Sequence, residues 1–478
     1  MEPRILVLNL PGLVLKCGSR WYNVTKCGGA TLRYYPYPWF MGYTVALLKT
    51  NGFEAKLIDA VAMEWSIEQT LACVESFNPT HIVCEPTWAS VGEDSAFISS
   101  LPKSINTIAV GNYATNFPYE ALTRSGANFV VIGEYEFSIL EFFKSGDRSL
   151  PVNFIGHGKT NYQLPELIAD LDIFPYPERD DVPFGFYNEP SCFGKNLVMV
   201  SSRGCRLRCG FCNVEAIYGR HVYRRRSAVN VVDEMEYVFS KYDIDEIYFD
   251  DDNMVSQKNH IDGICKEILR RKCKFRWLCM GDGLVDDETL ELLAAAGCVT
   301  YKFGLEHLDI DVLRAIPKPL KPERSLRIIT KCRELGIRSY VNLIVGLPHS
   351  TYHKDIDMIK RVIDANPDLL QFAIATPYPG TNFYKNAIAN GWLISNDPSR
   401  FDATGDSAVF YPNYKREDIR MAFEAAWHMW YRHVLTRKWS TLWFFLHSEI
   451  RRNGLFESLQ KTGRYALKFF DNRYLLRN

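Results

Sequence analysis

Three cysteines that lie close together are the clearest chemical signal in the sequence. Cys205, Cys209 and Cys212 fall on a C-x-x-x-C-x-x-C spacing. Thiolates at such short spacings are typical ligands of soft metals and of iron–sulfur clusters. Because three thiolates leave one iron of a four-iron cluster open, the pattern indicates a catalytic cluster that can hold a substrate at that iron. A zinc site completed by a distant histidine is the alternative.

The other cysteines show no comparable spacing. The chain has 13 in all, an odd number, and nothing directs it to an oxidising compartment, so a disulfide framework is not expected. Most of the others stand singly in apolar segments, as small buried hydrophobic residues do. Cys17 with Cys27, and Cys273 with Cys279, have no partner pair at ligand spacing, which argues against a second cluster.

Charge and composition exclude several classes of protein. The 478 residues include 56 Lys and Arg against 56 Asp and Glu, a net charge of +0, so no overall basic character favours nucleic acid. Hydrophobic residues make up 47% of the chain, which is ordinary globular usage. No apolar run approaches the ~20 residues of a membrane span, and Met1–Leu10 lacks the order of a signal peptide. We expect a soluble, cytoplasmic protein of about three domains.

Strand-like and helix-like segments alternate over residues 1–148. This alternation predicts an α/β fold with a doubly wound parallel sheet of the Rossmann-like, flavodoxin-like kind. Ligands of such sheets bind beyond the carboxyl ends of the strands, and there the sequence places Gly, Asn, Thr and acidic residues. The predicted strands are Arg4–Asn9, Glu54–Ile58, His81–Cys84, Thr107–Val110 and Phe129–Ile132.

A proline-rich linker occupies 149–195, and the alternation resumes over 196–395. Six βα units there predict a partial (β/α)6 barrel, whose active site belongs at the carboxyl ends of its strands. The three cysteines follow the first of these strands, Leu197–Ser201, and so lie on an active-site loop. Residues 396–478 are helical and aromatic, which favours a cap that packs on the barrel. An apolar substrate channel and a membrane surface are the alternatives for these helices.

The cysteine spacing after the first barrel strand is the signature of radical S-adenosylmethionine (radical SAM) enzymes. The whole chain resembles those radical SAM enzymes that carry an N-terminal cobalamin-binding domain, a class with cobalamin-dependent methylases and the bacteriochlorophyll ring-forming cyclase. The similar stretches are YYPYPWFMGYTVALLKTNGFEAKLIDA (34–60), AVGNYAT (109–115), VVIGEYE (130–136), LDIFPYPER (171–179), RRSAVNVVDE (225–234), IYFDDDN (247–253), FGLE (303–306), IVGLP (344–348) and TPYPGTNF (376–383).

The resemblance implies roles for several barrel residues. Cys205, Cys209 and Cys212 would bind a [4Fe-4S] cluster whose open iron chelates the amino and carboxylate groups of SAM. A flavodoxin- or ferredoxin-type donor would supply the electron. The other implied roles are adenine packing for Phe211, ribose hydroxyl binding for Glu306, SAM amino contact for Asp250 and Asp251, and a catalytic, substrate-facing position for Tyr378.

The residues alone leave other readings of these positions open. Glu306 could be a surface carboxylate. Asp250 and Asp251, together with Asp252, could form a hard-metal site. Tyr378 lies in Pro-Tyr-Pro-Gly, which could be no more than a tight turn.

The resemblance also implies cobalamin, held in a crevice between the sheet and the barrel. The motif D-x-H-x-x-G, which provides a lower histidine ligand to cobalt in other enzymes, does not occur in the sequence. We therefore expect cobalamin without a lower histidine ligand. The candidate contacts, each of which could instead serve a turn or a cap, are Asp59, Thr87, Gly111, Gly133 and Glu134.

Taken together, the resemblance predicts a cobalamin-dependent radical SAM methyltransferase. In that class SAM cleavage gives a 5′-deoxyadenosyl radical that abstracts a substrate hydrogen, and methylcobalamin then delivers a methyl group to an unactivated carbon. A radical cyclase or rearrangement enzyme on the same scaffold is the alternative, and a non-catalytic cobalamin-binding sensor is a remote one. The expected substrate is a small molecule such as a lipid, a terpenoid or a natural-product intermediate, and peripheral membrane contact is compatible with the aromatic helices.

Overall fold

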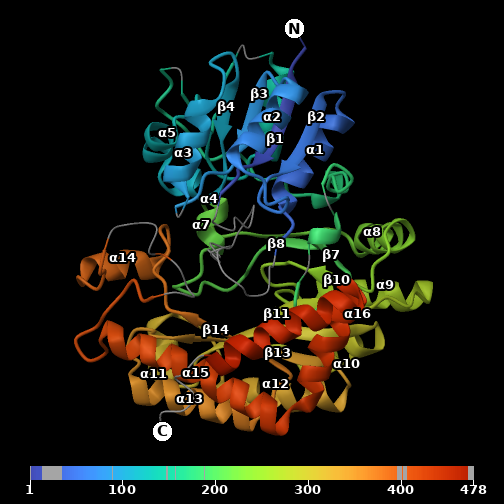
Figure 1. Cartoon of the computed structure of the whole chain (residues 1–478), viewed down its shortest axis with the longest axis vertical. Coiled ribbons are helices and arrows are strands. Elements are labelled where there is room, and N and C mark those ends of the chain that lie inside the picture. Colours follow the sequence, from blue (N-terminus) through green and yellow to red (C-terminus); the bar gives the residue numbers. More distant parts are fainter. Residues whose placement is uncertain are drawn as a thin grey trace.

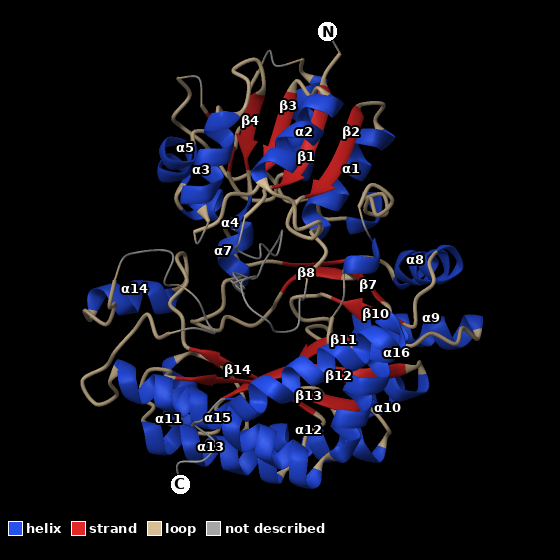
Figure 2. Ribbon diagram, viewed as in Figure 1, coloured by secondary structure: helices blue, strands red, loops and turns tan. Residues whose placement is uncertain are grey.

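Two α/β units lie one above the other in the computed structural model, joined by a linker and followed by helices (Figure 1). The structure describes residues 2–12, 35–88, 90–146, 149–156, 158–182, 184–187, 189–395, 401 and 406–471, with side chains described to residue 455. The strands of the N-terminal sheet point their carboxyl ends toward the barrel unit (Figure 2). Cys17 and Cys27 lie outside the described residues.

The N-terminal unit is a six-stranded sheet in the order β2-β1-β3-β4-β5-β6. The order of β1 to β5 is that of flavodoxin-like sheets, which confirms the predicted doubly wound fold. The strands are buried runs rich in Ile, Leu and Val, as parallel strands covered on both faces must be. Strand β6 is antiparallel to β5 and comes from the proline-rich linker, an edge strand that the sequence did not predict.

The strands of this unit are β1 (Arg4–Asn9), β2 (Glu54–Asp59), β3 (His81–Cys84), β4 (Asn106–Ala109), β5 (Phe129–Val131) and β6 (Phe154–Ile155). Its helices are α1 (Trp39–Thr50), α2 (Ile67–Phe77), α3 (Val91–Ser100), α4 (Gly111–Asn116), α5 (Pro118–Ser125) and α6 (Glu136–Lys144). Short 3₁₀ turns follow in the linker at Leu171–Ile173 and Phe184–Phe186.

The second unit is an open, all-parallel half-barrel in the order β14-β13-β12-β11-β10-β7, which confirms the predicted partial barrel. Its strands are β7 (Asn196–Met199), β10 (Glu246–Phe249), β11 (Trp277–Asp282), β12 (Cys298–Glu306), β13 (Arg338–Val345) and β14 (Leu369–Ile374). Its helices are α7 (Val214–Tyr218), α8 (Ala228–Lys241), α9 (Lys258–Arg271), α10 (Asp287–Ala295), α11 (Ile310–Ala315), α12 (Pro322–Glu334), α13 (Tyr352–Asp364) and α14 (Asn382–Ala389).

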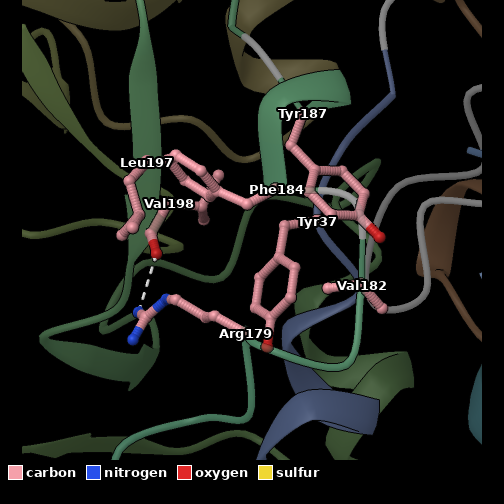
Figure 3. A pocket seen from close by; sticks show the side chains of 7 residues that line it. All are labelled: Tyr37, Arg179, Val182, Phe184, Tyr187, Leu197 and Val198. Atoms are coloured by element: carbon pink, nitrogen blue, oxygen red, sulfur yellow. Dashed lines mark hydrogen bonds between the residues drawn. The ribbon is translucent and has the colours of Figure 1, made fainter. Parts of the chain in front are cut away.

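The linker is a packed joint between the two units. Asp181 lies 2.8 Å from Lys49 of α1, while the neighbouring Arg179 donates to the Val198 carbonyl of β7 (3.0 Å) and to Glu234 of α8 (2.8 Å). Arg179 and Glu234 are both buried, so each charge is compensated by the other. Residues of the first unit, the linker and β7 together line a small cavity here (Figure 3): Tyr37, Arg179, Val182, Phe184, Tyr187, Leu197 and Val198.

Two helices end the described chain, and the second lies on the side of the barrel away from its active-site loops. Helix α15 (Arg416–Arg437) packs on β14 and α13, and α16 (Trp439–Asp471) follows it. Ser448 of α16 accepts from the Gly194 amide just before β7, and Thr441 donates to the Asp368 carbonyl just before β14. Because these partners precede their strands, α16 crosses the amino ends of the barrel. This placement supports the cap interpretation over a substrate channel.

Among the described residues, none of the helices combines the length and the apolar character that crossing a bilayer requires.

Candidate active site

The cysteine loop connects the two strands of a short antiparallel hairpin that follows the carboxyl end of β7. The hairpin pairs β8 (Ser202–Gly204) with β9 (Tyr223–Arg225). Gly204 has a φ of +87°, and a Cβ there would lie 2.1 Å from the Val222 carbonyl oxygen, so the start of the loop requires glycine. The Gly204 amide donates to Asp252 (2.7 Å), which follows β10. Two strand ends of the barrel therefore fix the backbone just before Cys205.

The three thiols on this loop are free and partly exposed. The Cys212 amide donates to the Cys209 carbonyl (3.0 Å), so these two cysteines share one turn. The Cys205 sulfur receives three donors: the Leu207 amide (3.4 Å), Asn253 Nδ2 (3.5 Å) and the Ser256 hydroxyl (4.0 Å). Hydrogen bonds to sulfur tune iron–sulfur centres. The loop therefore fits a cluster held by three thiolates in the type and sequence spacing of its ligands and in the hydrogen bonds that one sulfur receives.

Burial raises the pKa of all three thiols. For Cys209 it raises the pKa to about 11, although the nearby Lys318 opposes this rise. The pKa values of Cys205 and Cys212 are raised by burial in the same way. Without iron these thiols are protonated at neutral pH, so cluster assembly must displace their protons.

Within the described ranges, no three His, Cys, Asp or Glu side chains are placed to hold a metal ion.

Two other segments hold the cysteine loop from either side. The Gly210 amide donates to the Ile316 carbonyl (2.8 Å), and the Gly210 carbonyl accepts from the Phe383 amide at the start of α14 (2.8 Å). The loop that contains Ile316 leads directly to Lys318. The cysteine loop is thus anchored to the loops after β12 and β14, at the same end of the barrel.

Glu306 and Lys318 form a buried ion pair beside the cysteines. Lys318 Nζ lies 2.6 Å from Glu306 Oε1, and the two side chains are 6% and 9% exposed. Burial alone would lower the pKa of Lys318, but the Glu306 and Cys209 charges more than offset this and raise it. Lys318 Nζ also lies 5.8 Å from the centre of the Phe211 ring. Glu306 is therefore a buried residue of the active-site edge and not a surface carboxylate.

The backbone around Glu306 is unusual for a strand end. Glu306 has a φ of +60°, in the left-handed region, and a register irregularity in the β12–β13 pairing falls between Gly304 and Glu306. A Cβ at Gly304 would lie 2.0 Å from Glu306 Oε1 and 2.9 Å from Lys318 Nζ. The side chain of Glu306 therefore folds back over Gly304 to reach Lys318.

The three aspartates after β10 have separate surroundings. Asp250 accepts from Trp39 of the N-terminal unit (3.2 Å) and from the Tyr248 hydroxyl (2.9 Å). Asp251 is fully buried and accepts from the amide and the hydroxyl of Ser201 (3.0 and 2.7 Å). Asp251 thus braces the end of β7, as Asp252 braces Gly204.

Three of the five predicted cobalamin contacts meet at one small cavity between the two units. Gly111, Gly133 and Glu134 line it together with Asn112 and with Ile217 of α7. Gly111 and Gly133 have φ values of +90° and +80°, conformations that favour glycine at these strand ends. The Asn112 amide nitrogen is buried at this cavity and has no hydrogen-bond partner among the described residues.

The other two predicted contacts lie elsewhere at the same edge of the sheet. Asp59 accepts from Asn9 (2.8 Å) and from the Tyr187 hydroxyl (2.9 Å) in a buried network. The Thr87 hydroxyl lies 2.7 Å from that of Ser90 in the turn before α3. Both therefore have structural hydrogen bonds of their own.

Arg203 joins the two units next to the cysteines. Its side chain is 3% exposed and pairs with Glu134 (3.0 Å) in the turn after β5 and with Glu136 (2.8 Å) at the start of α6. Its guanidinium lies 4.4 Å from the centre of the Phe174 ring. Arg224 of β9 reaches the same Glu134 carboxylate (2.5 Å). Arg203 and Arg224 thus neutralise glutamates of the N-terminal unit. Glu134 is paired with both arginines.

Tyr378 lies on a loop after β14 that also reaches the N-terminal unit. Tyr378 is partly exposed, and its carbonyl accepts from the Thr381 hydroxyl (2.6 Å) in a tight turn. A Cβ at Gly380 would lie 2.1 Å from Asn116 Oδ1 of α4 and 2.7 Å from Ala216 of α7. Pro-Tyr-Pro-Gly therefore forms a tight turn, and this turn lies where α4, α7 and the barrel meet.

Three residues of this site escaped the sequence reasoning: Asn253, Ser256 and Lys318. Asn253 and Ser256 follow directly on the aspartate run after β10, and that position was the only available signal. Lys318 stands between two prolines with no periodic pattern around it.

Comparison with known proteins identifies the barrel. The Radical SAM superfamily model matches residues 199–377. This domain implies SAM and a [4Fe-4S] cluster as cofactors, and Cys205, Cys209 and Cys212 lie within it. The chain carries a radical SAM domain and is a radical SAM enzyme, which confirms the resemblance inferred from its sequence.

Relatives and solved structures extend beyond the barrel. An uncharacterized methyltransferase of Pyrococcus horikoshii is 25% identical over 82% of this chain and 87% of its own length. The anaerobic magnesium-protoporphyrin IX monomethyl ester cyclase of Rubrivivax gelatinosus is 23% identical over 75% of this chain and 67% of its own. The radical SAM methyltransferase TsrM from Kitasatospora setae, solved with cobalamin and a [4Fe-4S] cluster, shares the fold. Its TM-score is 0.70 at 17% identity, over 89% of this chain and 91% of that one.

Proposed function

We propose that this protein is a cobalamin-dependent radical SAM methyltransferase that acts on an unactivated carbon of a small molecule. The observation that carries the proposal is the juxtaposition of two edges. The carboxyl ends of the N-terminal strands face the cysteine loop of the barrel, and Arg203 with Glu134 locks them together. A cofactor held at each edge would meet the other across the same space.

The residues at the N-terminal edge suit a corrinoid in chemistry. Gly111 and Gly133 adopt left-handed conformations that turn the chain at the strand ends, and the side chains of Glu85 and Leu164 lie against them. The unpartnered Asn112 amide nitrogen supplies a donor for the amide-rich periphery of a corrinoid. The cavity there is much smaller than a corrin ring. We therefore infer that the ring lies over the carboxyl ends of the strands beside the cavity and not inside it.

The residues at the barrel edge suit SAM. Glu306 presents a carboxylate held by Lys318 for the ribose hydroxyls, and Phe211 offers an aromatic face for the adenine. The Asp250 carboxylate already accepts a hydrogen bond from Trp39 of the N-terminal unit. If Asp250 binds the SAM amino group, the same carboxylate would contact both. When bound, the cluster, SAM and cobalamin supply reductive radical formation and a transferable methyl group, and the protein orients them and excludes water.

A second candidate is a radical cyclase on the same scaffold. The magnesium-protoporphyrin cyclase of Rubrivivax gelatinosus is among the relatives of the chain and matches 75% of it. A cyclase needs the substrate radical but no methyl donor. The two candidates therefore differ in whether SAM passes its methyl group to cobalt.

The test is an anaerobic incubation of cluster-reconstituted protein with hydroxocobalamin, SAM labelled at the methyl group with deuterium, and a reduced flavodoxin or ferredoxin. Mass spectrometry would follow 5′-deoxyadenosine and labelled methylcobalamin. A methyltransferase is expected to form both. Formation of 5′-deoxyadenosine with no labelled methylcobalamin would favour the cyclase, and formation of neither would refute both enzymes.

A further inference from the structure

We propose that Lys318 is a positioning residue that sets the reduction potential of the cluster and holds Glu306 in place for SAM. This inference rests on the proposed function only in assuming the cluster and SAM, and it is independent of cobalamin. Its basis is one buried cation that pairs with a carboxylate and lies 5.8 Å from the ring of Phe211, between two of the cysteines in the sequence.

Lys318 is the cation that the fold places inside the site. Its side chain is 6% exposed, and its ammonium lies 2.6 Å from Glu306 Oε1. Its turn is fixed to the cysteine loop because the Ile316 carbonyl accepts from the Gly210 amide (2.8 Å), between Cys209 and Cys212. The arginines of the cysteine motif are placed differently: Arg203 is committed to Glu134 and Glu136, and Arg206 and Arg208 are exposed.

A buried cation beside a cluster favours the form with one more electron. Reduction adds one negative charge to a cluster that already carries three thiolates, and Coulomb interactions are strong where water is excluded. Net charge near the cluster and hydrogen bonds to its sulfurs are levers by which proteins set its potential. Lys318 therefore stabilises the reduced cluster, and Glu306 partly cancels this effect.

The same contact shapes the SAM site. Glu306 adopts a left-handed backbone conformation, and its side chain folds over Gly304 toward Lys318. A carboxylate in that position would be costly without a cationic partner. The contact with Lys318 thus directs the carboxylate that we assign to the ribose hydroxyls.

The experiment measures the cluster potential by EPR-monitored redox titration of reconstituted protein without SAM or cobalamin. Lys318→Met removes the charge at similar length and is expected to lower the midpoint potential. Glu306→Gln leaves Lys318 uncompensated and is expected to raise it. A tenfold change in the reduction equilibrium corresponds to about 59 mV for one electron, and we expect shifts of at least that order.

Controls separate charge from packing. Lys318→Arg keeps the charge and is expected to restore the potential. Lys321→Met removes an exposed lysine of the same loop and is expected to leave the potential unchanged. Equal potentials for wild type, Lys318→Met and Glu306→Gln, in variants with full iron content, would overturn the proposal. A shift of both variants in the same direction would overturn it as well.

The SAM role is read separately by calorimetry with S-adenosylhomocysteine. Lys318→Met is expected to weaken binding at least tenfold and Lys318→Arg much less. Unchanged affinity would overturn that part. Failure to form methylcobalamin would count against the proposed function while leaving both of these readouts intact.

Discussion

Arg203 Nη1 lies 3.0 Å from Glu134 Oε1, and both side chains are buried between the N-terminal sheet and the barrel. Arg203 directly precedes the glycine that begins the cysteine loop, and Glu134 lies in the turn after the fifth strand of the sheet. One ion pair therefore connects the edge expected to hold cobalamin to the loop expected to hold the cluster. The ion pair therefore fixes the carboxyl ends of the N-terminal strands relative to the cysteine loop, and this arrangement is part of the proposed site.

Arg203→Met should destabilise the protein strongly. It removes the partner of the buried Glu136 and leaves Glu134 with Arg224 alone, and breaking a buried pair costs about 3–5 kcal/mol. Chemical denaturation would show a lower free energy of unfolding. The matched control is Arg225→Met, because Arg225 is exposed on the same hairpin and should cost little. Equal effects of the two variants would contradict the joint as described.

The distance between these partners explains what the sequence could and could not predict. Alternating strands and helices predicted the parallel strands of both sheets, because that signal is local and repeats along the chain. Glu134 meets Arg203 and Arg224 across 69 and 90 residues, and no local pattern connects them. Glu134 was accordingly predicted as a cofactor contact, whereas the structure shows it engaged by two arginines at the edge of that cavity.

Other features were hidden for similar reasons. Strand β6 is a short edge strand within a proline-rich segment, and proline content masks strand signals. The Lys318 side chain reaches Glu306 only because the loop after β12 folds back on the cysteine loop. The cysteine motif itself was readable because all three ligands come from one loop.

Cys209→Ala should abolish the cluster and leave the fold intact. The variant is expected to lose iron, sulfide and the visible charge-transfer absorbance while its circular dichroism and thermal midpoint change little, since the thiol is at the site and not in the core. Cys73→Ala, a partly exposed cysteine of α2, serves as the control and should keep full iron content. Retained cluster absorbance in Cys209→Ala would refute the ligand assignment.

Gly304→Ala should damage the SAM site without unfolding the barrel. The new methyl group would lie 2.0 Å from Glu306 Oε1, so the carboxylate must move away from Lys318. Loss of a hydrogen bond to a charged group is worth about 1.5–3 kcal/mol, or roughly tenfold or more in affinity for S-adenosylhomocysteine. Gly263→Ala in α9 is the matched control, because its nearest contact is 3.7 Å and alanine favours helix. Normal affinity in Gly304→Ala would show that Glu306 does not bind the ligand.

His260 should make stability depend on pH. This histidine of α9 lies 3.0 Å from the Ser201 hydroxyl, and burial lowers its pKa from 6.5 to about 4. The unfolded chain takes up a proton near pH 6.5 while the folded chain does not. The folded state is therefore favoured above pH 6.5 and loses up to about 3 kcal/mol as the pH falls toward 4.

The measurement is the free energy of unfolding against pH for wild type and His260→Gln. The variant lacks the titrating group, so its curve should fall less steeply between pH 6.5 and 4. Parallel curves for the two proteins would show that the folded and unfolded states share one pKa for His260.

The central claim is that the N-terminal edge holds cobalamin beside the cluster loop. The most direct measurement is the corrinoid content of protein that is incubated anaerobically with hydroxocobalamin and then desalted. The account predicts one cobalamin per chain, retained in Cys209→Ala and weakened in Asn112→Leu, which removes the unpartnered amide donor at the edge of the sheet. Wild-type protein that elutes free of corrinoid, with its cluster intact, would contradict the account.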